Sequence, residues 1–348
     1  MTAALLRPGR QSTALLLADA EGTALRIRTL AKVALPSLTA QGLPNRAAGT
    51  IVRGLAEEAG YQGPATLLLP AGTAALARAE ADTPLGGTIT QAVVEDALAE
   101  IRRQLGGPGR AVLSCRPSAY TVDGRRTDAP VGQSGKVLGI DAVAFTAGVA
   151  ALSALDAAAR AGGLSVGHVV APADALAAVA LPDGEGTAVC LRTDDCLAVH
   201  AEGGTVRAQA RVPIGRRHLR QDLGEVLALE EDDAEQRLAA VLSGAASGQE
   251  TAVVEERLAE LSGLLNEAAA EAGLSPGKGP VLLGLPGSLF RPFGYAAAPP
   301  PALPEGAEDE ALLAGAAMIE LGVRGTRDTG FAFDARRGSV WSWLKRRF

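Results

Sequence analysis

Short apolar runs alternate with longer amphipathic stretches along most of the chain. Runs of four to eight apolar residues bounded by turn residues predict buried strands, and apolar residues three and four apart predict helices. The strands expected on this basis are Ala14–Ala18, Ala24–Ile27, Ala31–Leu35, Ala65–Leu69, Ala111–Ser114, Tyr120–Val122, Val137–Phe145, Val166–Val170, Thr187–Leu191, Leu197–His200, Val206–Val212 and Val281–Leu285. The expected helices are Asn45–Ala59, Thr90–Leu105, Val149–Ala161, Arg216–Leu227, Asp232–Val241, Val253–Ala272 and Asp309–Leu321, with Asn45 and Asp232 as N-caps.

The same order of elements occurs twice. Each half begins with a small meander, first over residues 14–35 and then over residues 187–212, and each later adds helices. Two similar α/β halves predict a duplicated fold, and a length of 348 residues suits about two core-forming units.

Composition narrows the class of protein. Hydrophobic residues make up 47% of the chain but aromatic residues only 3%, so the core must consist of Ala, Val, Leu and Ile. A net charge of −6 argues against a general nucleic-acid binder, and we expect no nucleic-acid partner. The three Cys and three His are scattered without zinc-ligand spacing, so we expect no metal site and a reducing cytoplasm.

Two features bear on membranes and redox chemistry. The longest charge-free apolar run, Ala142–Leu155, is shorter than the roughly 20 residues of a transmembrane helix, and the N-terminal apolar run stops at Arg7, too early for a signal peptide. Cys190 and Cys196 flank a short turn; they either pair or face inward as reduced strand residues.

The last ten residues, Ser339–Phe348, combine aromatic and basic side chains. Wound as a helix, Val340, Trp341, Leu344 and Phe348 share one face, with Trp343 at its border. The rest is largely basic, and the whole predicts an interfacial helix on anionic lipid. The expected membrane-binding residues are Val340, Trp341, Trp343, Leu344, Lys345, Arg346, Arg347 and Phe348. A helix docked on the protein's own core, or a disordered tail, remains the alternative.

Several motifs together resemble FtsA, the actin-like bacterial division protein. Ala119–Gly124 followed by Pro130–Gly135 resembles that family's Tyr-x-x-Asp and Pro-Val-Gly-x-x-Gly stretch in its inserted subdomain 1C. Val212-Pro213-Ile214-Gly215 with Asp222-Leu223, and then Ala234-Glu235, resemble the entry into subdomain 2B. Residues 340–348 resemble the family's membrane-targeting sequence. The resemblance covers nearly the whole chain in order.

The nucleotide motifs of the family are altered here. Actin-like ATPases cradle phosphates in two glycine-bearing turns. The first turn here reads Asp19–Leu25, one residue longer than usual, and the second, Cys190–Cys196, has no glycine and carries Asp194 and Asp195, which we expect to repel a triphosphate. The nucleotide-binding positions that the resemblance implies are Asp19, Gly22, Thr23, Asp194, Gly215, Glu235 and Gly284. ATP with Mg²⁺ is therefore the one cofactor to consider, bridged by a metal between Asp19 and Asp194 if it binds.

Three other patterns have simpler interpretations. Gly132–Lys136 is a poor P-loop because Val137 stands where Ser or Thr belongs, which favours a structural loop. His218 and its arginine neighbours could bind an anion, but a solvated basic helix face is the simpler interpretation. The acidic run Glu230–Asp233 suits a helix N-terminus.

The resemblance implies an α/β, actin-like (ribonuclease-H-like) duplicated fold with an FtsA-type 1C subdomain and a C-terminal amphipathic helix. The implied division is residues 1–73 and 148–180 for subdomain 1A, 74–147 for 1C, 181–213 and 278–323 for 2A, 214–277 for 2B, 324–338 for a flexible linker and 339–348 for the membrane helix.

The implied function is to tether the FtsZ ring to the cytoplasmic face of the plasma membrane at the division septum. The expected partners are the FtsZ C-terminal tail at subdomain 2B, anionic membrane lipid, further copies of the chain in filaments, and other divisome proteins. The protein is not expected to be an enzyme beyond a weak ATPase. Two alternatives stay open, a working actin-like ATP-binding protein and a PilM-like adaptor of a pilus assembly machine.

Overall fold

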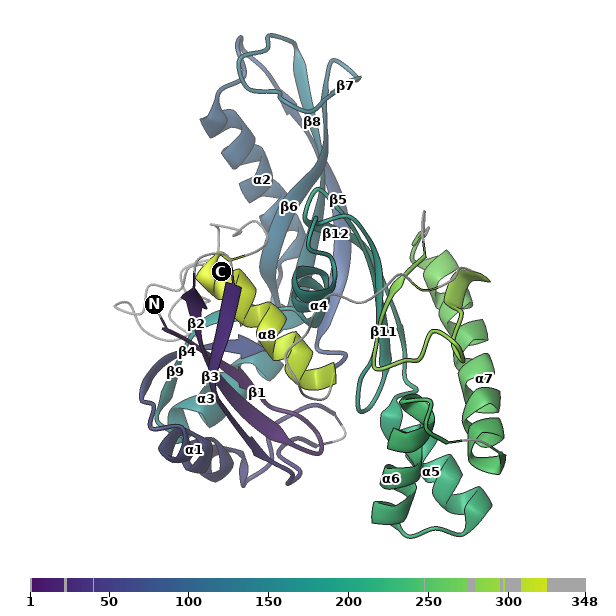
Figure 1. The fold of residues 1–348 in the computed structure, drawn as a ribbon. Helices are drawn as coiled ribbons and strands as arrows, with labels where there is room; N and C mark the ends of the chain where they lie inside the picture. Colours follow the sequence, from purple (N-terminus) through teal and green to yellow (C-terminus); the bar gives the residue numbers. More distant parts are fainter. Residues whose placement is uncertain are drawn as a thin grey trace. The chain divides into compact units, whose positions relative to one another are not determined.

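The computed structural model forms two compact units. It describes residues 2–21, 24–39, 41–246, 248–274, 279–294, 297 and 308–323. Unit 1 comprises residues 1–172 and the chain from Glu320 onward, and unit 2 comprises Ala173–Ile319 (Figure 1). The expected linker 324–338 and the expected membrane helix 339–348 lie outside the described residues. The division into four subdomains remains a prediction.

A five-stranded mixed sheet organises unit 1, in the order β3-β2-β1-β4-β9. Its strands are β1 Thr2–Arg7, β2 Thr13–Glu21, β3 Ala24–Val33, β4 Gly63–Leu68 and β9 Leu164–Val170. Helices α1 (Ala48–Glu58) and α3 (Val149–Ala161) pack against each other and against this sheet. β1 was not expected from sequence, and the separate strand expected at Ala31–Leu35 is wrong because β3 runs unbroken through Val33.

The start of α1 also differs from expectation. Asn45 was expected to cap the helix, but the N-cap position is Ala47, without a side-chain hydrogen bond. Asn45 instead closes the turn before the helix: its Oδ1 accepts from Ala47 N at 3.0 Å.

Residues 74–148 form a separate layer within unit 1. Four antiparallel strands stand in the order β5-β8-β6-β7, and α2 packs on the sheet. The elements are β5 Ala74–Pro84, α2 Gln91–Leu105, β6 Arg110–Val122, β7 Arg125–Thr127 and β8 Val137–Gly148. Thr90 caps α2 as expected, and Val94, Ala97 and Ile101 of this helix are buried. β5 was missed from sequence, although its Ala residues alternate with Arg78, Glu80 and Asp82.

A two-residue turn joins β6 to β7. Val122 pairs with Arg125, and the turn residues Asp123 and Gly124 both have positive φ, at 51° and 77°. Two positive φ angles define the type I′ hairpin that Asp-Gly favours. The Asp123 carboxylate accepts hydrogen bonds from the backbone N–H groups of Lys136 and Val137 at 2.8 and 2.9 Å, which fixes the loop before β8.

Unit 2 contains a four-stranded sheet in the order β12-β11-β10-β13. Its strands are β10 Gly186–Leu191, β11 Cys196–Glu202, β12 Thr205–Val212 and β13 Val281–Leu283. Three helices follow the meander, α5 Arg216–Leu227, α6 Glu231–Leu242 and α7 Gln249–Glu271. Asp232 lies inside the first turn of α6 and is not its N-cap, which is Glu230.

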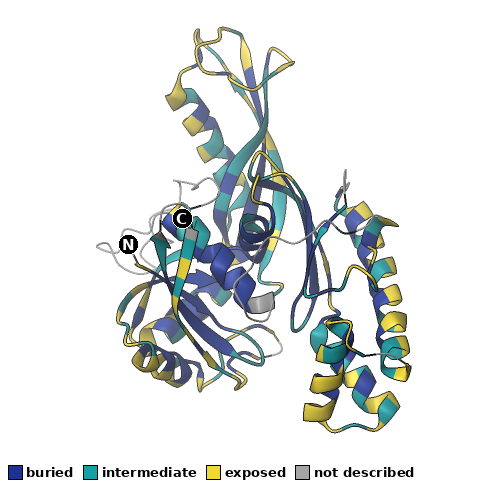
Figure 2. Ribbon diagram, viewed as in Figure 1, coloured by how far each residue is buried: buried dark blue, intermediate teal, exposed yellow. Residues whose placement is uncertain are grey.

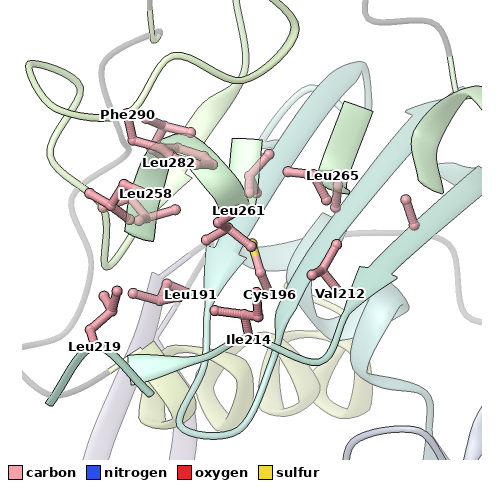
Figure 3. Close-up of a cluster of buried hydrophobic side chains, with 14 of the residues drawn as sticks. Leu191, Cys196, Val212, Ile214, Leu219, Leu258, Leu261, Leu265, Leu282 and Phe290 are labelled. Atoms are coloured by element: carbon pink, nitrogen blue, oxygen red, sulfur yellow. The ribbon is translucent and has the colours of Figure 1, made fainter. Parts of the chain in front are cut away.

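One apolar cluster holds the helices of unit 2 to its sheet (Figure 3). α7 contributes Leu258, Leu261 and Leu265 at i, i+3 and i+7, which places all three on one face of the helix. The other residues labelled in the cluster are Leu191, Cys196, Val212, Ile214, Leu219, Leu282 and Phe290.

The two main sheets have the same topology. In each, three strands form an antiparallel meander, and the first strand of that meander pairs in parallel with a later strand: β1 with β4, and β10 with β13. The expected duplicated α/β fold is therefore confirmed.

Two further helices are α4 (Pro172–Ala180) and α8 (Glu308–Leu321). α4 was missed from sequence. Residues 310–317 of α8 are buried on every side (Figure 2). Its last turn contacts the unit 1 sheet through Glu320, which accepts from Thr66 Oγ1 at 2.9 Å and also hydrogen-bonds His168 Nδ1.

Candidate functional site

The candidate site of unit 2 is built on the turn between β10 and β11. Four residues, Arg192–Asp195, join the strands, and Arg192 N donates to Asp195 O at 2.8 Å. This turn is the second phosphate motif implied by the sequence. The turn contains no glycine, and this backbone hydrogen bond spans it.

A buried ion network stabilises this turn. The Asp195 side chain is fully buried and accepts from Arg192 Nε and Nη2, both at 2.6 Å. Arg211 of β12 donates to the same carboxylate through Nε. A buried carboxylate is tolerated only when it is paired and hydrogen-bonded, and here two guanidinium groups supply both the charge and the donors.

The N-terminus of α5 lies against the same turn. Its first N–H groups donate to turn carbonyls, Arg216 N to Arg192 O at 2.9 Å and Arg217 N to Thr193 O at 3.0 Å. A side chain at Gly215 would collide with this turn, since its Cβ would lie 2.4 Å from Asp195 N. Free N–H groups at a helix start bind anions, but these two are occupied by the protein's own carbonyls.

His218 completes the cap of α5. Its Nδ1 accepts from Gly215 N at 3.0 Å, which requires a ring that is not protonated at this nitrogen. Partial burial, followed by the neighbouring Arg217 charge, lowers the pKa of His218 and favours that neutral form.

The arginines of α5 pair with acids instead of forming the solvated basic face that the sequence suggested. Arg217 Nε contacts Asp194 Oδ1 at 3.1 Å, and Arg216 Nη2 contacts Glu235 Oε1 at 2.7 Å. Arg220 contacts Glu231 at 2.7 Å. Asp194 and Asp195, which the sequence predicted to repel a triphosphate in the absence of a cation, are both paired with arginines of the protein itself.

The structure gathers three of the predicted nucleotide positions around the start of α5. Asp194, Gly215 and Glu235 lie there, with the two acids bound to different arginines. Gly284 follows β13 with a φ of 72°. In unit 1, Asp19 on β2 accepts from Thr2 Oγ1 at 2.6 Å and lies 3.6 Å from Arg28 Nε. Gly22 and Thr23 lie outside the described residues.

Sequence reasoning missed the two arginines that hold Asp195. The signal was available for Arg211, because the predicted meander sets β12 beside β11 and the register pairs Arg211 with Leu197, two residues from Asp195. Arg192 lies three residues before Asp195 and closes the turn that the sequence showed only as lacking glycine.

The other motifs have structural roles. Gly132–Lys136 is a loop, as favoured from sequence: Gly132 N donates to Ile89 O at 2.9 Å and the next element is a strand. Cys190 and Cys196 are both free and buried. They lie on opposite faces of the sheet, because Cys196 is opposite Leu191 and Cys190 is opposite Leu197.

Two features are absent from the described part of the chain, a cluster of metal-ligating side chains and a membrane-spanning helix. The described residues contain no cluster of three or more His, Cys, Asp or Glu arranged to hold a metal ion. None of their helices combines the length and apolar character needed to cross a membrane. The expected membrane-binding residues, Val340 to Phe348, lie outside this part of the chain.

Comparison with known proteins identifies the inserted layer and the fold. Residues 75–146 match the family model of the SHS2 domain inserted in FtsA. Among solved structures, the PilM-PilN type IV pilus biogenesis complex is similar at 16% identity and a TM-score of 0.65, covering 92% of this chain and 98% of that one. The ethanolamine utilization protein EutJ from Carboxydothermus hydrogenoformans is similar at 14% identity and a TM-score of 0.47, covering 82% and 77%. No curated protein matches the chain in sequence.

These likenesses define the class in two steps. The fold, shared over most of the chain with a PilM structure, is the actin-like fold. Within that fold, residues 75–146 are similar to the SHS2 domain inserted in FtsA, so this part of an actin-like chain resembles FtsA.

Proposed function

We propose that this chain is a cell-division protein that anchors FtsZ filaments to the cytoplasmic face of the plasma membrane. The observation that carries the proposal is the FtsA-type inserted domain at residues 75–146. The amphipathic C-terminal sequence 339–348 supports it, because a helix over these residues would place Val340, Trp341, Leu344 and Phe348 on one face, and the segment also carries three consecutive basic residues, as an interfacial helix does.

The implied subdomains have different expected binding roles. Residues 339–348 bind anionic lipid, and residues 214–277 bind the FtsZ C-terminal tail. A ten-residue helix binds lipid weakly, so self-association of the chain strengthens membrane attachment through avidity. Other divisome proteins then assemble on this scaffold at the septum.

We further propose that the nucleotide site is degenerate and that the protein is not an enzyme beyond residual ATPase activity. The arginine network around Asp195 and the occupied N–H groups of α5 support this part of the proposal. ATP with Mg²⁺ is the cofactor against which this part of the proposal is tested.

The experiment is co-sedimentation of the purified full chain with anionic vesicles, with and without ATP. We expect the full chain to pellet with vesicles irrespective of ATP, and a chain ending at Gly338 to stay in solution. A Lys345→Gln/Arg346→Gln/Arg347→Gln variant should lose most of its binding. The matched control, Arg103→Gln/Arg125→Gln/Arg126→Gln, removes the same charge from exposed positions of unit 1 and should bind like the wild type.

Two results would contradict the proposal. Equal binding by the full chain and the shortened chain would remove the membrane role of residues 339–348. Binding only in the presence of ATP would show that the altered turns still work. FtsZ recognition is measured separately, by fluorescence anisotropy of a labelled FtsZ C-terminal peptide titrated with the full chain.

A PilM-like adaptor is the second candidate, favoured by the similarity to the PilM-PilN complex over 92% of this chain. It predicts binding of a labelled PilN-type protein in the same anisotropy assay, and no binding of the FtsZ peptide. The peptide that binds distinguishes the two functions.

A further inference from the structure

Two long strands of unit 1 lie at the ends of their sheets. β3, of 10 residues, ends the five-stranded sheet, and β5, of 11 residues, ends the four-stranded sheet (Figure 1). Neither strand pairs on its outer side with another strand of the described chain. Open edges present backbone donors and acceptors that another strand can pair with, and proteins usually protect them.

The exposed side chains of β3 are mostly basic: Arg26, Arg28, Leu30 and Lys32 are exposed. The register shift opposite Leu17 and Ala18 of β2 places Arg26 on one face of the strand and Leu30 and Lys32 on the other. Arg28 Nε lies 3.6 Å from Oδ2 of Asp19, the residue paired with Arg26. Figure 2 shows exposed positions recurring along β3. The end of the strand that carries Arg26 and Arg28 suits an acidic partner strand.

The corresponding stretch of β5 is acidic. Glu80 and Asp82 are exposed, and Glu80 lies directly opposite the exposed Asp141 of β8. Like charges directly opposite each other destabilise a sheet. The structure gives none of these three carboxylates an ion-pair partner among the described residues. Arg78 marks the end of the acidic stretch, two residues before Glu80.

We propose that β3 of one copy pairs edge to edge with β5 of a second copy. The two strands match in length, and the end of β3 that carries Arg26 and Arg28 is opposite in charge to Glu80 and Asp82 of β5, so cross-strand pairs between Arg26 or Arg28 and Glu80 or Asp82 form alongside the backbone ladder. The contact also neutralises the repulsion between Glu80 and Asp141. This inference rests on the self-association in the proposed function and names its surfaces.

The contact joins two different surfaces of the same chain. Such a heterologous interface leaves an open β3 at one end and an open β5 at the other, so copies add head to tail into a ring or a filament. The association should weaken with salt because charges on exposed strand faces are screened.

The test reverses the charges in three variants of the full chain and follows assembly by sedimentation velocity. Arg26→Glu/Arg28→Glu makes both edges acidic, and Glu80→Lys/Asp82→Lys makes both edges basic. We expect each double variant, tested alone, to raise the midpoint concentration for assembly at least tenfold. The fourfold variant, in which the charges are exchanged, should recover assembly, and an equimolar mixture of the two double variants should also assemble.

A control variant and the membrane assays distinguish failure of this interface from failure of the proposed function. Glu57→Lys/Glu58→Lys reverses two exposed acids of α1 and should assemble like the wild type. Assembly that is unaffected by the double variants, or not recovered in the fourfold variant and in the mixture, overturns the inference. So does a wild type that stays monomeric at about 100 μM. Vesicle and FtsZ-peptide binding remain intact if only this interface is wrong, and are lost if the proposed function is wrong.

Discussion

Asp194 and Asp195 are adjacent acids in one turn, yet their surroundings give them different energetic weight. Asp195 has no exposed side-chain surface and binds two arginines, whereas Asp194 and its partner Arg217 are 14% and 29% exposed. Removing one member of a buried ion network leaves the charges of the other members uncompensated. Solvent screens the partly exposed pair of Asp194 and Arg217.

Asp195→Ala should therefore lower the free energy of unfolding by about 3 kcal/mol, near the lower end of the range for broken buried pairs, because Arg211 keeps some solvent access. Asp194→Ala should cost about 0.5 kcal/mol. Urea unfolding of the two variants measures the difference. Equal losses would show that the Asp195 network adds nothing beyond an ordinary surface pair.

The carboxyl of Asp123, in the type I′ turn, makes the stability of the fold depend on pH. The two N–H groups that it accepts from, first Lys136 and then Val137, lower the pKa of this carboxyl below its ordinary value of 3.8. A carboxyl with a lowered pKa in the folded state stabilises the fold above that ordinary value, and its contribution disappears as pH falls through the folded pKa.

We expect Asp123→Asn to melt at a lower temperature than the wild type at pH 7, with the gap closing below about pH 4. Asn tolerates the positive φ of this position, so the comparison isolates the charge. Thermal melts across pH 3–7 measure the gap. A gap that persists unchanged at pH 3 would assign the effect to turn geometry.

At the scale of elements, patterns within one segment predicted helices well. α2, α3, α5 and α8 begin and end within a residue of expectation, because their apolar spacing and first-turn residues are local signals. β1, β5 and α4 were missed. β5 is an edge strand built from alanine, so its alternation lacks the β-branched residues that normally mark a strand.

The packing of α8 rests on one small residue. A Cβ at Gly315 would lie 2.0 Å from the carbonyl oxygen of Ala175 on α4, so the helices approach as closely as glycine allows. Gly263 is also helical, on α7, but its Cβ would meet no atom within 4 Å. The two glycines therefore form a matched pair.

Gly315→Ala should destabilise the protein by about 3 kcal/mol or more, because a backbone carbonyl cannot move aside as a side chain can. Gly263→Ala should stabilise it by about 0.5–1 kcal/mol through helix propensity alone. Chemical unfolding of both variants tests the contrast, and a neutral Gly315→Ala would mean that α4 and α8 separate without cost.

At the scale of the whole molecule, the proposed degenerate nucleotide site has a testable consequence. The β10–β11 turn and the start of α5 are joined by hydrogen bonds between the protein's own groups, which occupy donors that a phosphate would need. This arrangement predicts little response to ATP.

We expect about 1 mM ATP with Mg²⁺ to shift the melting temperature by less than about 1 °C. A site with a Kd of about 10 μM would add about 2.7 kcal/mol under these conditions, which is a rise of roughly 4 °C for a chain of this size. Differential scanning fluorimetry measures the shift. A rise of that size, abolished by Asp19→Ala, would restore the ATP-binding alternative.

The sequence by itself determined the repeated order of most strands and helices, the cap of α2 at Thr90, and the resemblance of residues 119–135 to the inserted domain. These features depend on neighbouring residues, and local periodicity records them. Only the tertiary structure decided which charges meet. Asp195 is neutralised by Arg211 because β12 pairs beside β11, and the edges of β3 and β5 are open because of strand order. Both depend on residues brought together by the fold, and composition carries no record of that pairing.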